Sequence, residues 1–147
     1  MISRPGLPWI DGTDAIAELD SAWDAAVAAM SAAGCVDVLD LCARRTAMLL
    51  DHRPTVEAMS DDGRRALAGW PSHESFGERE RAALEFTEQY LLDVASSTDD
   101  QVARLGRGIG SEFVVDFVNA LLVVEQRLRL DLGLGRVLAG SAVGGGS

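Results

Sequence analysis

The sequence predicts an all-α protein that folds as one bundle of about six helices. Apolar residues make up 48% of the 147-residue chain and aromatic residues only 5%, and the abundance of Ala and Leu is typical of helical bundles. The chain has four prolines and no run that alternates Val, Ile or Thr with polar residues, as strands do. Apolar residues instead recur at spacings of three and four.

Composition also excludes several classes of function. The formal net charge is −10, and all 13 basic residues are arginines. An acidic surface repels phosphate backbones, so we expect no nucleic-acid partner. The absence of lysine excludes a lysine Schiff base. The N-terminal sequence lacks the apolar segment of a signal peptide. Residues 113–124, the most apolar stretch, are fewer than the roughly 20 residues that cross a bilayer. We therefore expect a cytoplasmic protein with no membrane partner.

The sequence of the N-terminal third predicts an extended arm that is followed by two helices. The arm covers residues 1–12, and Trp9 and Ile10 would anchor it to the body or to a neighbouring subunit. Thr13 is expected to cap a helix over residues 14–33, which Gly34 ends. A second helix is expected over residues 35–50. The apolar stripe of the first helix comprises Ile16, Leu19, Trp23, Val27 and Met30.

The remaining helices follow from capping and breaking signals. Pro54 suits the first turn of a short helix over residues 54–59, and Ser60 is expected to cap another that ends near residue 67. A long helix is expected from about residue 77 to 94, and Thr98 with Gln101 predicts a capping box for a helix that ends near residue 107. Ser111 is expected to cap the last helix, over residues 112–131. Residues 13–135 would form the domain, and residues 136–147 a flexible tail.

The last predicted helix is apolar on nearly every side, so we expect it to be the central, most buried element. Asp116, Asn119 and Gln126 fall near one side of it. Buried polar groups need partners, so these three would either line a pocket or specify a contact between subunits.

Spacing within DLCARRTAMLLDHRPTVEAM, residues 40–59, carries a family resemblance. Asp40 precedes His52 by twelve positions, and Thr55 and Met59 follow at intervals of three and four. This arrangement resembles the AhpD-like branch of the carboxymuconolactone decarboxylase family, in which an acidic residue, the two cysteines of a CxxC motif and a histidine hold these positions. Further landmarks extend the resemblance over roughly residues 15–135: Trp70, residues 76–94, residues 98–102 and residues 126–135.

The resemblance implies an AhpD-like helical bundle that forms a homo-oligomer. It also implies a redox-dead site, because both redox cysteines and the relay histidine are replaced. Arg127 matches an arginine that the family often carries, with Asp116 or Glu112 as its expected partner.

Cys35 and Cys42 are the only cysteines. Seven residues of helix rise by about 10 Å, whereas a disulfide needs Cα atoms within about 7 Å. We therefore expect two reduced, buried core residues. Residual alkylhydroperoxidase activity that uses Cys42 is a weaker alternative.

The reversal between the second and third predicted helices is the candidate site. His52 lies at a helix N-terminus and would serve as a general acid or base or hold an anion, or alternatively as a capping or solvated histidine. Thr55 would supply a hydroxyl. Asp40 is the third candidate catalytic residue, or alternatively the ion-pair partner of Arg44 four residues later. The candidate substrate-binding residues are Arg45, Met59 and Cys42.

We expect no metal or other cofactor, because His52 and His73 lack a spaced set of carboxylates. The leading hypothesis is a protein that binds a small organic molecule at the reversal and, if it is an enzyme, transforms it by acid–base chemistry of the decarboxylase, isomerase or lyase type. The alternative is a non-catalytic oligomeric scaffold. On the first hypothesis, His52 matters mainly for function and Asp40 mainly for stability.

Overall fold

The computed structural model describes the backbone of residues 13–144 and, apart from Val94, the side chains of residues 17–134. The described backbone contains seven α-helices, two short 3-10 turns and no strand, which confirms the all-α prediction for these residues. The predicted arm, with Trp9 and Ile10, lies outside the described part. The elements are α1 (Thr13–Ala32), α2 (Val36–Leu49), α3 (Arg53–Ala58), α4 (Asp61–Ala68), α5 (Glu78–Asp93), η1 (Val94–Ser96), α6 (Asp99–Ile109), η2 (Ser111–Phe113) and α7 (Val114–Gly144).

The reversal between α2 and α3 is built by the backbone. The N–H of His52 donates to the carbonyl of Ala47 at 2.8 Å, and the N–H of Asp51 donates to that of Met48 at 3.2 Å. This pair of bonds is a Schellman motif, which needs a left-handed residue just beyond the helix. Asp51 takes that conformation with φ of 55°, as Gly34 does after α1 with φ of 69°. The motif turns the chain sharply and places His52 at the start of α3.

Local sequence signals correctly predicted the starts of α3, α4 and α6. The Ser60 hydroxyl accepts a hydrogen bond from the N–H of Gly63 at the start of α4. Thr98 and Gln101 form the predicted capping box at the start of α6. Pro54 lies in the first turn of α3. Each of these interactions spans only three or four residues, so the local sequence is enough to specify it.

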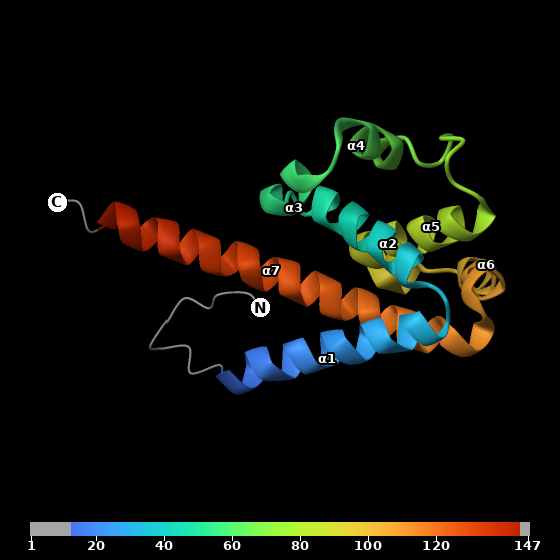
Figure 1. Cartoon of the computed structure of the whole chain (residues 1–147), viewed down its shortest axis with the longest axis horizontal. Helices are drawn as coiled ribbons and strands as arrows, with labels where there is room; N and C mark the ends of the chain where they lie inside the picture. Colours follow the sequence, from blue (N-terminus) through green and yellow to red (C-terminus); the bar gives the residue numbers. More distant parts are fainter. Residues whose placement is uncertain (1–12, 145–147) are drawn as a thin grey trace.

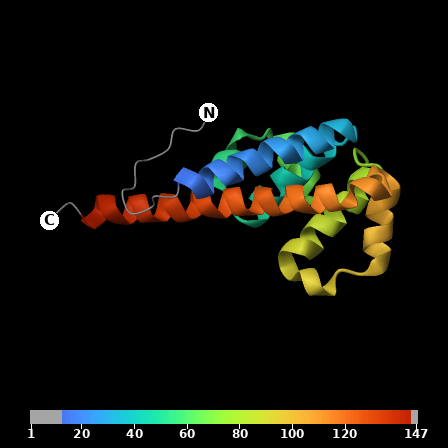
Figure 2. The same cartoon turned by 90° about the horizontal axis from the view of Figure 1, so that it is seen from below.

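Helix α7 is the longest element, and it organises the packing. It lies along α1 and also packs against α2, while α5 packs against α2 and α6. Figures 1 and 2 show α1 and α7 side by side, with the C-terminal part of α7 extending past the start of α1. In the described part of the chain, no helix combines the length and the apolarity needed to span a bilayer.

The expectations about both ends of the last helix are wrong. Ser111 begins the 3-10 turn η2 rather than capping α7, which starts at Val114. The helix also continues through Gly144 instead of ending near residue 131, so residues 136–144 of the predicted tail are helical. Isolated glycines cost a helix about 1 kcal/mol each, but they end it only where the backbone turns left-handed.

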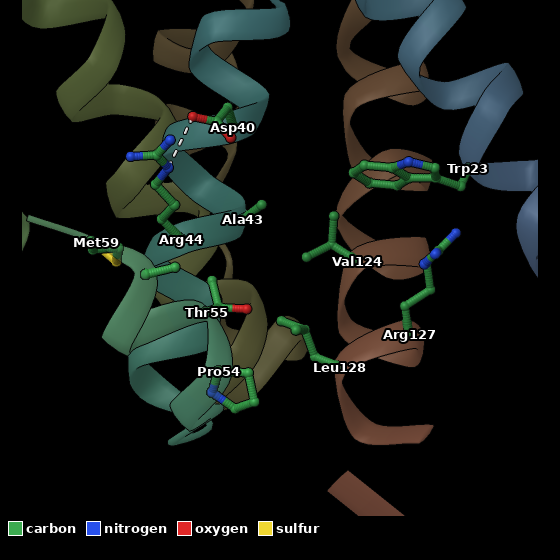
Figure 3. A pocket seen from close by; sticks show the side chains of 11 residues that line it. Trp23, Asp40, Ala43, Arg44, Pro54, Thr55, Met59, Val124, Arg127 and Leu128 are labelled. Atoms are coloured by element: carbon green, nitrogen blue, oxygen red, sulfur yellow. Dashed lines mark ion pairs between the residues drawn. The ribbon is translucent and has the colours of Figure 1, made fainter. Parts of the chain in front are cut away.

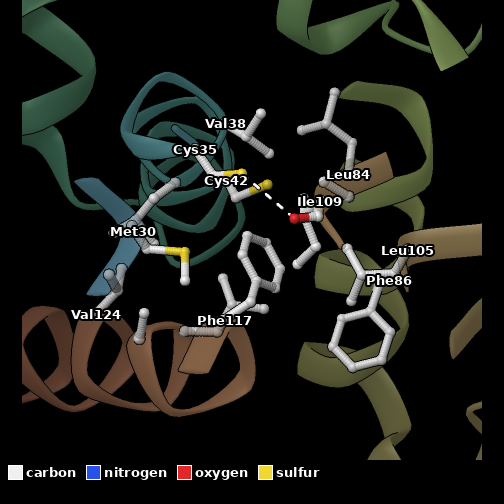
Figure 4. Packing of buried hydrophobic residues seen from close by; sticks show 14 of the residues in the cluster. Met30, Cys35, Val38, Cys42, Leu84, Phe86, Leu105, Ile109, Phe117 and Val124 are labelled. Atoms are coloured by element: carbon white, nitrogen blue, oxygen red, sulfur yellow. Dashed lines mark hydrogen bonds between the residues drawn. The ribbon is translucent and has the colours of Figure 1, made fainter. Parts of the chain in front are cut away.

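The core lies where α1, α2, α5, α6 and α7 meet (Figure 4). Phe117 of α7 is fully buried at its centre, and its ring meets the edge of Phe86 at a centroid distance of 6.5 Å. Other fully buried members are Met30, Val38, Leu84 and Leu105.

Over residues 114–134, where its side chains are described, α7 buries one face and exposes the other, which corrects the expectation that it is the most buried element. Phe117, Ala120 and Leu121 face the core, but Val115 remains 69% exposed and Leu122 40% exposed. The apolar residues of the outer face, Val115 and Leu122, therefore do not pack into this core.

Candidate functional site

A pocket of about 570 Å³ lies between the pair α2–α3 and the pair α1–α7 (Figure 3). Pockets of this size accommodate small organic ligands. Most of the lining is apolar: Trp23, Ala43, Pro54, Ala58, Met59, Val124 and Leu128. The polar lining residues are Asp40, Arg44, Thr55 and Arg127. The molecule is therefore an all-α protein with a candidate small-molecule site between its helices.

Three of the residues predicted from the sequence line this pocket: Asp40, Thr55 and Met59. Figure 3 shows the Thr55 hydroxyl pointing across the pocket toward α7. His52 is not a lining residue but is hydrogen-bonded to Thr55, so it lies behind the hydroxyl. Four of the six predicted site residues therefore lie in one region: Asp40, His52, Thr55 and Met59.

His52 is buried and makes one hydrogen bond through each ring nitrogen. Nδ1 lies 2.7 Å from Oγ1 of Thr55, and Nε2 lies 2.6 Å from Oδ2 of Asp131 on α7. An ionised carboxylate only accepts hydrogen bonds, so Nε2 carries the proton in this contact. When the ring is neutral, Nδ1 accepts the hydrogen bond that the Thr55 hydroxyl donates. Asp131 thus orients the ring and sets its tautomer.

Sequence reasoning missed Asp131. It is 79 positions from His52, and no local spacing connects the two residues. Asp131 lies within the 126–135 landmark of the family resemblance, where nothing marked it as a partner of the reversal. Its side chain is 61% exposed, whereas the His52 ring is almost fully enclosed. The contact also ties α3 to α7.

Arg127 faces α1 rather than the partner expected for it. Its Nη1 lies 3.1 Å from Oδ1 of Asp20, and its guanidinium carbon lies 5.5 Å from the centre of the Trp23 ring. The expected pairing with Asp116 or Glu112 is therefore wrong. The rotation of α7 about its axis determines which helix Arg127 meets, and that rotation is set by tertiary packing.

Asp40 forms the predicted ion pair with Arg44. Arg44 Nε lies 3.0 Å from Asp40 Oδ2, and the two side chains are 49% and 58% exposed. Exposed pairs of this kind contribute about 0–1 kcal/mol. The pair lies at the edge of the pocket, where Figure 3 marks it with a dashed line.

Arg45 lies elsewhere. Its Nε donates to Oε1 of Glu88 at 2.6 Å, and the indole N–H of Trp70 donates to the same oxygen at 2.8 Å. The Arg45 side chain is mostly buried in this contact, which ties α2 to α5 and to the segment before it. The structure does not bring Arg45 to the pocket.

Cys42 also lies away from the pocket. Cys35 and Cys42 are free and buried, as predicted. Burial raises the pKa of the Cys42 thiol to about 12, against a smaller opposing effect of a hydrogen bond with Thr87. The thiolate is the nucleophilic form, so this environment disfavours thiol chemistry at Cys42.

No protein-family model, curated protein or solved structure significantly matches the chain. The likeness to the AhpD-like branch stays a prediction from the sequence. Among the described side chains of residues 17–134, no three of His, Cys, Asp or Glu gather closely enough to hold a metal ion.

Proposed function

We propose that this chain binds a small, largely apolar organic molecule with an anionic group in the pocket between α1, α2, α3 and α7. We propose further that Thr55 and His52 act on this molecule by acid–base chemistry. One observation carries the proposal: a hydroxyl that lines a mostly apolar pocket is hydrogen-bonded to a buried histidine. The family resemblance agrees with it, because a redox-dead member of that branch would retain the pocket without its thiols.

The charges at the pocket support an anionic ligand. Arg44 and Arg127 both line it, and a guanidinium binds a carboxylate through two parallel hydrogen bonds. Each arginine already pairs with a partly exposed carboxylate, of Asp40 and Asp20 respectively. Exposed ion pairs are weak, so a ligand carboxylate can share or replace these partners at little cost.

Octanoate should bind more tightly than octanol, by about 10-fold, since one charge-assisted contact contributes about 1.4 kcal/mol. Trp23 lines the pocket, so its fluorescence reports on both ligands, and a Trp23→Phe variant identifies the signal. Arg127→Gln should remove the preference. Arg129→Gln, on the same helix but paired with Glu125 at the surface, should keep it. Equal binding of the two ligands would contradict the anionic ligand, and no binding of either would contradict the pocket.

The outer face of α7 favours a second candidate, an oligomeric protein whose last helix meets another copy. Val115 and Leu122 are exposed and seven residues apart, which places them on one helix face. Asn119 and Gln126 are exposed on the same face, so these residues fit a contact between subunits better than a buried pocket. Polar residues within an apolar seam set the register of such contacts.

Light scattering at micromolar concentration should therefore return a particle larger than the 15.6 kDa chain. The double variant Val115→Asp, Leu122→Asp should shift it toward the monomer, because charge on this face would be buried without a partner. Leu92→Asp, at an exposed position of α5, should leave the particle unchanged. A wild-type protein that scatters as a monomer would refute this candidate.

A further inference from the structure

We infer that Thr55, His52 and Asp131 form a nucleophilic triad that transfers the acyl group of a small carboxylic ester to water. The inference rests on the proposed function, because it places the ester in the same pocket. It names the nucleophile, the base, the residue that orients the base and the class of substrate.

The geometry meets the requirements of an activated hydroxyl. Such a site needs the nucleophile within about 2.6–3.2 Å of a base, and the base oriented by a third group. The two contacts of His52, at 2.7 Å to Thr55 and 2.6 Å to Asp131, satisfy both conditions. In the serine proteases the hydroxyl meets Nε2 and the carboxylate meets Nδ1. Here the two nitrogens exchange these roles, which leaves the relay chemically equivalent.

A purely local role does not account for the His52 side chain. His52 holds the N-cap position of α3, yet its ring makes no capping hydrogen bond to that helix. The ring reaches to Thr55 on one side and to α7 on the other. Of the three groups, Thr55 is the one that lines the pocket, so a bound ester would meet the hydroxyl and not the base.

The reaction balances without any oxidant or reductant. Oγ1 of Thr55 attacks the ester carbonyl carbon, and its proton passes to Nδ1 of His52. The bond to the leaving alcohol breaks as the alcohol takes that proton. Water then attacks the acyl-threonine and gives a proton to Nδ1, and Thr55 recovers the proton as the carboxylic acid leaves. Asp131 stabilises the imidazolium in both halves and is a positioning residue.

The pocket lining limits the acyl group. Its apolar walls favour an aliphatic chain over a polar one. The guanidinium groups of Arg44 and Arg127, also in the lining, would stabilise the carboxylate that forms when the ester is hydrolysed. We therefore expect esters of short and medium-length aliphatic acids to be preferred.

p-Nitrophenyl butyrate provides the test. Wild-type protein should release p-nitrophenolate, and mass spectrometry of its peptides should find a butyryl group on Thr55. Thr55→Val should abolish both, and Thr55→Ser should retain them. His52→Gln and Asp131→Asn should each slow adduct formation by about 10-fold or more, and Asp131→Glu should recover part of the rate. His73→Gln should have no effect, and it controls for hydrolysis by an exposed imidazole.

Circular dichroism must show that each variant is folded. Hydrolysis that persists in folded Thr55→Val, or a butyryl group found only elsewhere, would overturn the triad. Octanoate binding without any adduct would refute the triad and leave the proposed pocket intact. If octanoate does not bind and no adduct forms, the triad and the proposed pocket are both refuted.

Discussion

Replacing Phe117 by alanine should lower the free energy of unfolding by about 3–5 kcal/mol. Phe117 is fully buried, and it packs against Phe86 where α7 meets α5. The substitution removes apolar contact and leaves a cavity that the surrounding helices can fill only in part. Urea unfolding followed by circular dichroism measures the loss.

The control is Leu92→Ala, which also shortens an apolar side chain. Leu92 is largely exposed on α5, so its replacement should change the free energy of unfolding by no more than about 0.5 kcal/mol. Equal losses for Phe117→Ala and Leu92→Ala would show that Phe117 is not at the centre of the core.

His52→Ala should lower the free energy of unfolding by about 1–3 kcal/mol, and Asp40→Asn by about 0.5 kcal/mol or less. His52 is buried, and its removal breaks the hydrogen bonds to Thr55 and Asp131. Asp40 has only an exposed pair with Arg44. The sequence alone predicted the opposite order, because it assigned His52 at the helix N-terminus mainly to function and Asp40, with Arg44 as its partner, mainly to stability.

Thermal melting of the two variants tests the order, and His52→Gln separates function from stability. His52→Gln should slow the chemistry at Thr55 by about 10-fold or more in a folded protein, whereas Asp40→Asn should leave its rate unchanged. Should folded Asp40→Asn lose function while the His52 variants keep it, the acidic position of the family resemblance carries the chemistry and His52 is structural.

The sequence by itself determined the helical class and most helix starts. Ser60, Thr98 and Pro54 act within one turn of their own helices, so their effect depends on no distant residue. The burial of Cys35 and Cys42 as free thiols was also predicted, because seven residues of helix separate them too far for a disulfide and free cysteine behaves as a small apolar residue. The local pattern was ambiguous at the end of α7, where the glycines after residue 132 are compatible with either a tail or a continuing helix.

Only the tertiary structure decided which side chains meet at the pocket. The sequence indicated His52 and Thr55, because they hold the two cysteine positions of the family resemblance at the start of a helix. It gave no sign that Asp131 would complete the set, or that Arg127 would face Asp20. These partners come from α7 and α1, and their meeting depends on how those helices are rotated and offset against their neighbours. Rotation and offset are set by the packing of buried side chains around Phe117, which couples residues far apart in the chain and leaves no mark in local spacing.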